Sequence, residues 1–138
     1  MKQINFITKE SFEKFGRIID FTGRKENPAF EVVIKSEEDP WRIAMLRVEE
    51  REFTALERHP SSLETFEPVE GICLLLVSLE TQKSDYEIFV LDRPVCLDRN
   101  VWHGLVTLTG VSKIKITENL EVDVDYFNLD RPLGVFAG

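Results

Sequence analysis

The sequence is poor in cysteine and histidine, with two residues of each type among 138. Cys73 and Cys96 lie in apolar segments, and one pair of cysteines makes no disulfide framework, so we interpret both as buried free thiols. No apolar run approaches the roughly 20 residues that a membrane-spanning helix needs. The first ten residues also lack the apolar stretch of a signal peptide. These absences predict a cytoplasmic protein that has no membrane partner.

Basic side chains are in the minority, because 17 Lys and Arg stand against 25 Asp and Glu and leave a net charge of -8. Nucleic acids and anionic membranes are bound through basic patches, so this balance argues against both as partners. The hydrophobic fraction of 43% is typical of a globular protein. A chain of this length is expected to form a single domain, residues 1–138.

Short segments of alternating or continuous apolar character recur along the chain, separated by turn residues. This pattern predicts an all-β sandwich or barrel rather than an α/β fold. Thr8 is expected to cap a short N-terminal helix that runs to about Phe15 and ends at Gly16. The tail from Glu118 is either an edge strand or an extension that contacts a partner. The predicted strands are residues 3–7, 17–21, 29–34, 41–48, 52–59, 71–79, 86–91, 95–97, 101–109 and 111–117.

Both histidines lie in segments that combine apolar and polar groups. On a strand over residues 52–59, Glu57 and His59 share one face, and Arg58 points to the other. On the strand over 101–109, His103 shares its face with apolar residues, and Trp102 points away as a core residue. Charged groups on such faces are paired, bound to metal or placed at a wet mouth. We therefore expect Glu57, His59 and His103 to face a common cavity.

The spacing of Glu57, His59, Glu64 and Gly71 resembles the first motif of the cupins, H-x-H, four residues, E, six residues, G, with Glu57 in place of the first histidine. Asp98, Asn100 and His103 take the positions of the second motif, P-x-G-x-x-H. Within the cupins, L-E-R-H-P at 56–60 and R-N-V-W-H at 99–103 resemble the ureidoglycolate lyases, also called ureidoglycolate hydrolases. In that family the second motif reads Y-H-R-N-V-W-H-H. Here Leu97, Asp98 and Gly104 replace Tyr, His and the last His.

The resemblance implies a cupin-like β-barrel, that is, a double-stranded β-helix or jelly roll, preceded by the short helix. It also implies cleavage of ureidoglycolate to glyoxylate and urea, a step of allantoin catabolism. In that reaction a base removes the hydroxyl proton, an acid protonates the leaving nitrogen, and a cation holds the carboxylate. His103 and His59 would be base and acid in either order, with Glu57 and Asp98 as further catalytic groups. Arg99 is the first candidate to bind the substrate carboxylate, and Arg58 is the second.

Two interpretations of the cluster stay open. Glu57, His59, Glu64 and His103 could hold a divalent transition metal, because they offer two imidazoles and two carboxylates. Without a metal, the same groups would act as general acid and base.

Two classes of function also stay open: a lyase-like enzyme acting on a small carboxylate, and a non-catalytic cupin that binds a metabolite or forms a dimeric interaction module. Residues 71–79 are apolar on both faces, and a small barrel fills only its inner face. We therefore predict a homodimer that covers the other face.

Overall fold

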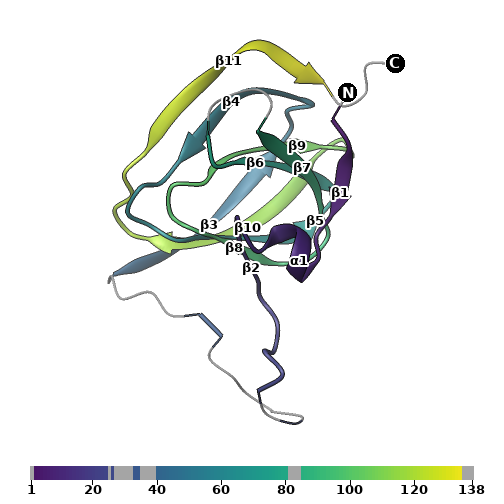
Figure 1. Cartoon of the computed structure of the whole chain (residues 1–138). Coiled ribbons are helices and arrows are strands. Elements are labelled where there is room, and N and C mark those ends of the chain that lie inside the picture. The colour runs from purple at the N-terminus through teal and green to yellow at the C-terminus, as the bar shows by residue number, and fades with distance from the viewer. Residues whose placement is uncertain (1, 25, 27–32, 35–39, 81–84, 135–138) are drawn as a thin grey trace.

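The computed structural model describes residues 2–24, 26, 33–34, 40–80 and 85–134, which form two β-sheets and one short helix, α1 (Lys9–Phe12) (Figure 1). The first sheet contains, in order across it, β1 (Ile4–Phe6), β7 (Tyr86–Leu91), β6 (Cys73–Ser78), β9 (Trp102–Thr107), β4 (Glu52–Arg58) and β11 (Asp125–Gly134). The second contains β2 (Gly16–Ile18), β8 (Val95–Leu97), β5 (Glu64–Glu70), β10 (Ser112–Asn119) and β3 (Trp41–Val48).

The strands from β3 to β10 follow the order of a jelly roll. Four of them form the row β4-β9-β6-β7 and the other four form β3-β10-β5-β8, and all pairings within both rows are antiparallel. Between β3 and β10, each strand is followed in the chain by a strand of the other sheet, except that β6 and β7 form a hairpin within the first sheet. Cupins share this double-sheet architecture. The prediction of an all-β, cupin-like barrel with a short N-terminal helix is therefore confirmed.

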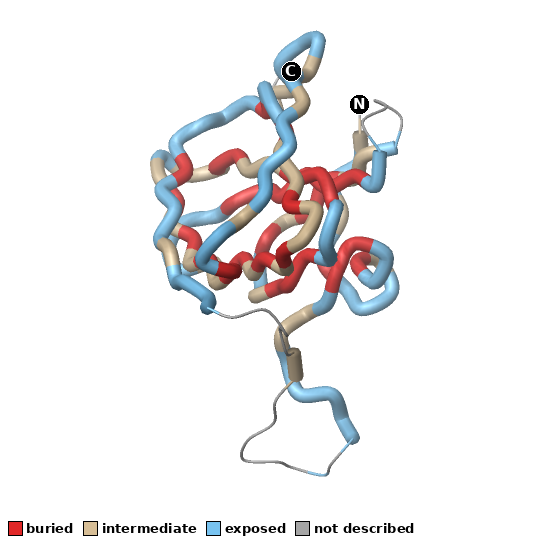
Figure 2. Tube along the Cα trace, turned by 90° about the vertical axis from the view of Figure 1, so that its left-hand side faces the viewer, coloured by how far each residue is buried: buried red, intermediate tan, exposed pale blue. Residues whose placement is uncertain are grey.

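The apolar side chains form two cores rather than one. The first lies between the sheets, because it joins Leu75 and Phe89 of the first sheet to Phe66 and Ile114 of the second. The second core contains only side chains from the first sheet and therefore lies on its outer face. The central strand β6 serves both cores, with Leu75 and Val77 on one side and Leu74 and Leu76 on the other. Figure 2 shows buried residues gathered in the middle of the molecule and exposed residues along its outer segments.

This second core corrects part of the sequence analysis. The outer face of β6 is covered within the chain, since Leu74 and Leu76 are fully buried in the second core, against which Phe127, Leu129 and Leu133 of β11 also pack. The tail from Glu118 thus forms an edge strand beside β4. A second copy of the chain is not needed to cover β6, so the homodimer stays a prediction without its original argument.

Several boundaries differ from the predicted ones. The helix ends at Phe12 instead of Phe15, although the predicted cap is present: the Ser11 amide donates to Thr8 Oγ1, and the Thr8 amide donates to Ser11 Oγ. Gly16 opens strand β2, where a Cβ would collide with the Cys96 carbonyl of β8. Residues expected to connect two strands form β5 instead. The strand predicted over 29–34 falls almost wholly outside the described residues.

Candidate active site

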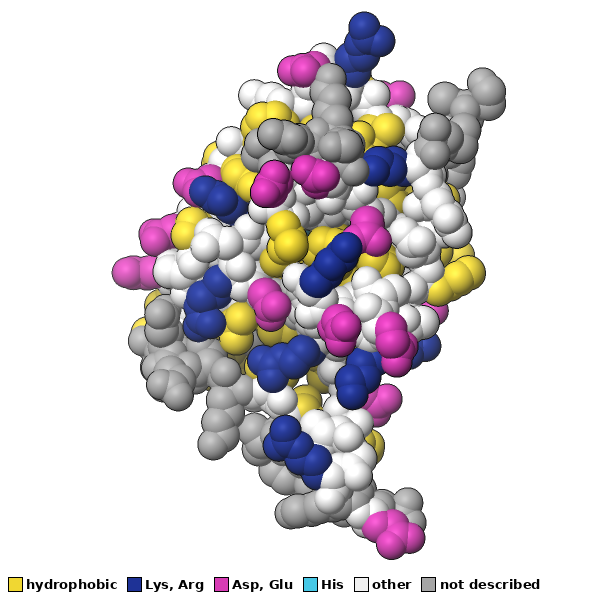
Figure 3. All heavy atoms as spheres, in the orientation of Figure 1, with side chains coloured by type: hydrophobic (Ala, Val, Ile, Leu, Met, Phe, Trp, Pro, Cys, Tyr) yellow, Lys and Arg dark blue, Asp and Glu magenta, His cyan; other side chains and the backbone are white. Residues whose placement is uncertain are grey.

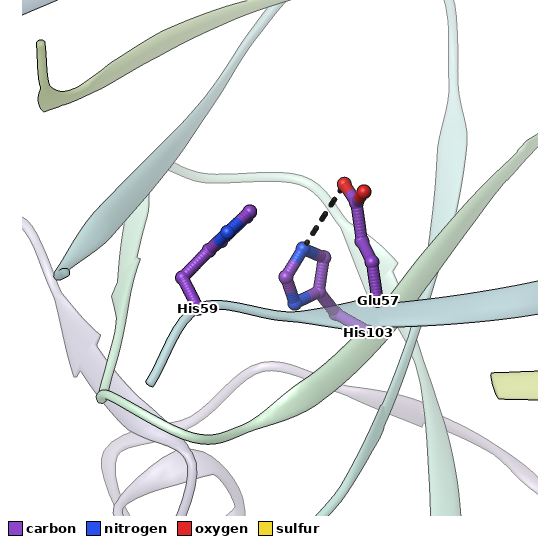
Figure 4. Close-up of side chains that lie close together, drawn as sticks. All are labelled: Glu57, His59 and His103. Atoms are coloured by element: carbon purple, nitrogen blue, oxygen red, sulfur yellow. Dashed lines mark ion pairs between the residues drawn. The ribbon is translucent and has the colours of Figure 1, made fainter. Parts of the chain in front are cut away.

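The site begins with two residues that face each other across neighbouring strands. Glu57 of β4 and His103 of β9 are paired in register, and Glu57 Oε1 lies 3.6 Å from His103 Nε2. His59 follows directly after β4, and its ring centroid lies 5.2 Å from that of His103. Figure 4 shows the three side chains pointing toward one another. The alternation that placed Glu57 and His59 on one face thus holds in the structure.

Glu64 brings the second sheet into the site. It is the first residue of β5, and its carboxylate lies between the two imidazoles: Oε1 is 3.1 Å from His103 Nε2, and Oε2 is 3.1 Å from His59 Nε2. The side chain of Glu64 is only 6% exposed, against 42% for Glu57. The three buried groups are therefore held in the interior, while Glu57 reaches toward solvent.

Backbone carbonyls fix the orientation of both imidazole rings. His59 Nδ1 lies 3.1 Å from the Asp123 carbonyl oxygen, and His103 Nδ1 lies 3.0 Å from that of Val101. Because a carbonyl can only accept, each Nδ1 carries a hydrogen and donates. In the neutral ring this leaves the lone pair on Nε2, and both Nε2 atoms point at Glu64. Such an arrangement is typical of imidazoles that bind a metal.

A second row of charged groups lies behind Glu64. Glu118 of β10 is paired in register with Glu64 of β5 on one side and with Arg42 of β3 on the other. The Arg42 guanidinium donates to Glu118 Oε1 from Nε at 3.2 Å and from NH2 at 2.8 Å. The site therefore extends across three strands of the second sheet.

These contacts set the direction of each pKa. Burial opposes the charged form of Glu64, but the imidazoles of His103 and His59 outweigh it and hold the pKa well below its usual range. Burial likewise opposes protonation of His103, and Glu57 and Glu64 overcome it and raise the pKa to about 10. Glu64 raises the pKa of His59 against the same penalty. Burial and the adjacent Glu64 raise the pKa of Glu118, and Arg42 opposes the rise.

Four buried polar atoms in this cluster lack a hydrogen-bond partner: His59 Nε2, His103 Nε2, Glu64 Oε1 and Glu118 Oε2. The short contacts around Glu64 have the distance of hydrogen bonds but not their direction. Buried polar atoms are normally satisfied, so a cluster of unsatisfied ones indicates a site for an ion or for water. Nitrogen and carboxylate donors together suit a divalent transition metal. The residues predicted as metal ligands therefore fit one, and the structure adds Glu118 to them.

A cavity of about 260 Å³ lies beside the cluster, and Glu57, Phe66 and His103 form part of its lining. Phe66 packs its ring 5.4 Å from that of His103. Among the described residues that line the cavity, Arg47 of β3 is the one Arg or Lys. Sequence reasoning did not single out Arg47.

The structure does not bring three of the predicted site residues to this cavity. Asp98 and Arg99 are exposed in the turn before β9, where Arg99 Nε donates to the Ser61 carbonyl at 3.2 Å. Arg58 takes the opposite face of β4, as its alternation predicts, where it pairs with Asp125 and stacks on the Trp102 ring at 4.6 Å. None of the three belongs to the lining of the cavity beside Glu57 and His103.

At two motif positions, Gly71 and Asn100, the backbone has positive φ, 78° and 68°. The predictions for Trp102 and for the two cysteines are confirmed. Trp102 is 6% exposed in the outer core. Cys73 and Cys96 are free and buried, and burial raises the pKa of the Cys96 thiol to about 11.

Glu118 was missed because the predicted strand stopped at Thr117, and Arg42 was missed because its contact with Glu118 depends on the pairing of β3 with β10. The signal was the alternation of Ile114 and Ile116 on the buried face, which continues to Glu118.

No family model matches this chain, and no curated protein matches it in sequence. Three solved structures are similar at low identity. The S161A mutant of Bacillus subtilis oxalate decarboxylase OxdC has 13% identity and a TM-score of 0.48, over 64% of this chain and 24% of that one. The WlaRB TDP-quinovose 3,4-ketoisomerase from Campylobacter jejuni has 13% identity and a TM-score of 0.47, over 69% of this chain and 70% of that one. A dTDP sugar isomerase from Desulfovibrio desulfuricans G20 has 14% identity and a TM-score of 0.44, over 83% of this chain and 80% of that one.

The sheet order and the site together define the class: a cupin-like jelly-roll barrel with two histidines and three glutamates at one end of its core. The described part of the chain contains no helix that is long and apolar enough to cross a membrane. Figure 3 shows acidic and basic side chains interspersed on one face of the barrel.

Proposed function

We propose that the protein is an enzyme that acts on a small carboxylate at a divalent transition metal held by Glu57, His59, Glu64 and His103. The observation that carries this proposal is the set of buried donor atoms without hydrogen-bond partners, contributed by residues in or next to β4, β5 and β9. A cluster that served only to bind the two sheets together would be expected to satisfy these atoms.

The donor spacing supports the proposal. Bonds of about 2.0–2.2 Å from a metal to nitrogen or oxygen place neighbouring ligand atoms roughly 3.0–3.5 Å apart. The separations here are 3.1, 3.1 and 3.6 Å. The carbonyls of Asp123 and Val101 supply the outer hydrogen bonds that orient ligand imidazoles. When bound, such a metal would polarise a carbonyl or hydroxyl oxygen of the substrate.

The residues of the cavity favour a carboxylate substrate. Arg47 lies on β3 at the edge of the cavity and is exposed, and we assign its planar donor fork, the geometry that carboxylates accept best, to the substrate carboxylate. Glu57 is the one half-exposed member of the cluster, and we assign it the removal of a proton from the substrate. The apolar ring of Phe66 limits the water around His103.

Ureidoglycolate is our candidate substrate, because the motifs L-E-R-H-P and R-N-V-W-H resemble those of the ureidoglycolate lyases. In that reaction the carboxylate of Glu57 takes the hydroxyl proton, the carbonyl of glyoxylate forms, and the carbon–nitrogen bond breaks. The leaving nitrogen then receives a proton, and urea departs. Glu57 lines the cavity, so the proton that it has taken, on the carboxylate oxygen that does not hold the metal, is placed to be returned to the leaving nitrogen.

The test combines metal analysis of the purified protein with a urea-release assay on ureidoglycolate. We expect bound divalent metal, urea release by the metal-loaded protein, and loss of both in His103→Ala. A folded His103→Ala variant that retains metal and turnover would overturn the proposal. Bound metal without urea release would retain the metal centre and reject ureidoglycolate as its substrate.

A further inference from the structure

The two carboxylate oxygens of Glu64 face two different imidazoles. Oε1 faces His103 Nε2 and Oε2 faces His59 Nε2, each at 3.1 Å. The His103 side also contains Glu57, at 3.6 Å. A carboxylate placed in this way, with a different nitrogen ligand at each oxygen, is suited to bridge two cations.

The His59 side has a third donor of its own. His59, Glu64 and Glu118 offer ligand atoms that all lie within 4.8 Å of one another. Their side chains are only 7%, 6% and 7% exposed. Arg42 occupies Glu118 Oε1, whereas Glu118 Oε2 is buried without a hydrogen-bond partner, as is His59 Nε2.

Electrostatics also favours a cation at this position. Glu64 and Glu118 are direct neighbours in register on β5 and β10, and both are buried. Two buried carboxylates repel each other unless a proton or a cation lies between them. Arg42 is half exposed and contacts only Oε1 of Glu118, so it leaves Oε2 of that carboxylate buried without a hydrogen-bond partner.

We propose that His59, Glu64 and Glu118 form a second divalent-cation subsite, joined through the Glu64 carboxylate to a first subsite at Glu57 and His103. This inference rests on the metal centre proposed above and divides its ligands between two ions, with Glu57, His103 and one oxygen of Glu64 on the first and His59 moved to the second. In known two-metal sites the ions are about 3.5–4 Å apart. One imidazole and two carboxylates suit Mn²⁺, Fe²⁺ or Zn²⁺. A substrate carboxylate or hydroxyl in the cavity would then meet the first subsite, and the second would lie deeper.

The experiment uses Mn²⁺ as the probe. The full chain is freed of metal, dialysed against Mn²⁺ and examined for metal content and by electron paramagnetic resonance. We expect two Mn²⁺ per chain and the spectrum of a spin-coupled pair. Glu118→Gln keeps the size of the side chain but removes the charge, so it should reduce the content to one Mn²⁺ and give the six-line spectrum of an isolated ion. Glu121→Gln, an exposed acid on the same tail, is the control and should keep both.

The outcomes separate the two proposals. One Mn²⁺ per chain in the unsubstituted protein, with an uncoupled spectrum, overturns the second subsite and leaves the proposed function intact. Two Mn²⁺ retained in folded Glu118→Gln also overturns it. No bound Mn²⁺ in the unsubstituted protein counts against both. If Glu118→Gln does not fold, the coupled or uncoupled spectrum of the unsubstituted protein decides the question alone.

Discussion

At the scale of single residues, the arginine that we propose to bind the substrate carboxylate is Arg47 rather than Arg99. Arg47 lines the cavity, whereas Arg99 donates to the backbone of Ser61 at the surface. A hydrogen bond to a charged group contributes about 1.5–3 kcal/mol, so Arg47→Gln should raise KM for a carboxylate substrate roughly 10- to 100-fold. Arg99→Gln is the matched control and should leave KM unchanged. Steady-state kinetics of both variants would show the reverse pattern if Arg99 binds the substrate as the motif implied.

Protonation of the two imidazoles sets how the stability of the metal-free protein depends on pH. His103 has its pKa raised from 6.5 to about 10, so its stabilising effect is complete below about pH 6.5 and is lost between there and about pH 10. Glu64 has its pKa lowered from 4.5, so its effect is complete above that pH and is lost in acid. The contribution of this cluster to the free energy of unfolding should therefore be greatest between about pH 4.5 and 6.5, and urea unfolding at a series of pH values measures it. In His103→Gln most of the alkaline loss should disappear, because of the two imidazoles only His59 would still contribute to it, and an unchanged alkaline profile would contradict the assignment.

At the scale of the elements, β6 carries much of the apolar core. Leu76 is fully buried in the outer core, and truncation to Ala should lower the free energy of unfolding by about 2–5 kcal/mol. Val69 of β5 is 58% exposed, so Val69→Ala should change the free energy of unfolding by no more than about 0.5 kcal/mol. Urea titration measures both. Equal small effects would show that the outer core is loosely packed and that β11 does not cover it.

The elements also show how far the sequence could predict this protein. Alternation with a period of two placed most strands and put Glu57, His59 and His103 on inward faces, since a strand dictates which residues share a face. It could not assign the faces of β6, because both are apolar. Alternation alone predicts that Leu74, Leu76, Ile88 and Val90 line the inside of the barrel, whereas in the structure they lie in the outer core.

The pairing of Glu64 with Glu118 is a matter of register between β5 and β10. Those strands are more than forty residues apart in the chain, and no local pattern encodes that distance. The motif spacing located Glu64 but could not show that its carboxylate lies between the two histidines. The cupin-like motifs thus predicted the centre of the site, and only the sheet order revealed its second row.

At the scale of the whole molecule, we still expect a homodimer, now through a different surface. β3 is the edge strand of its sheet in the described part of the chain, and it exposes Trp41, Ile43 and Met45 at 57%, 56% and 58%. An edge strand offers unpaired backbone groups to another strand, and two copies of β3 can pair antiparallel about a two-fold axis. Such pairing would bury these three side chains beside the cavity residue Arg47.

We expect sedimentation at micromolar concentration to give a dimer for the unsubstituted chain and a monomer for Ile43→Lys. Val69 is equally exposed but lies on β5, so Val69→Lys is the control and should remain dimeric. A monomeric unsubstituted chain would reject the dimer, and a dimer that withstands Ile43→Lys would place its interface away from β3.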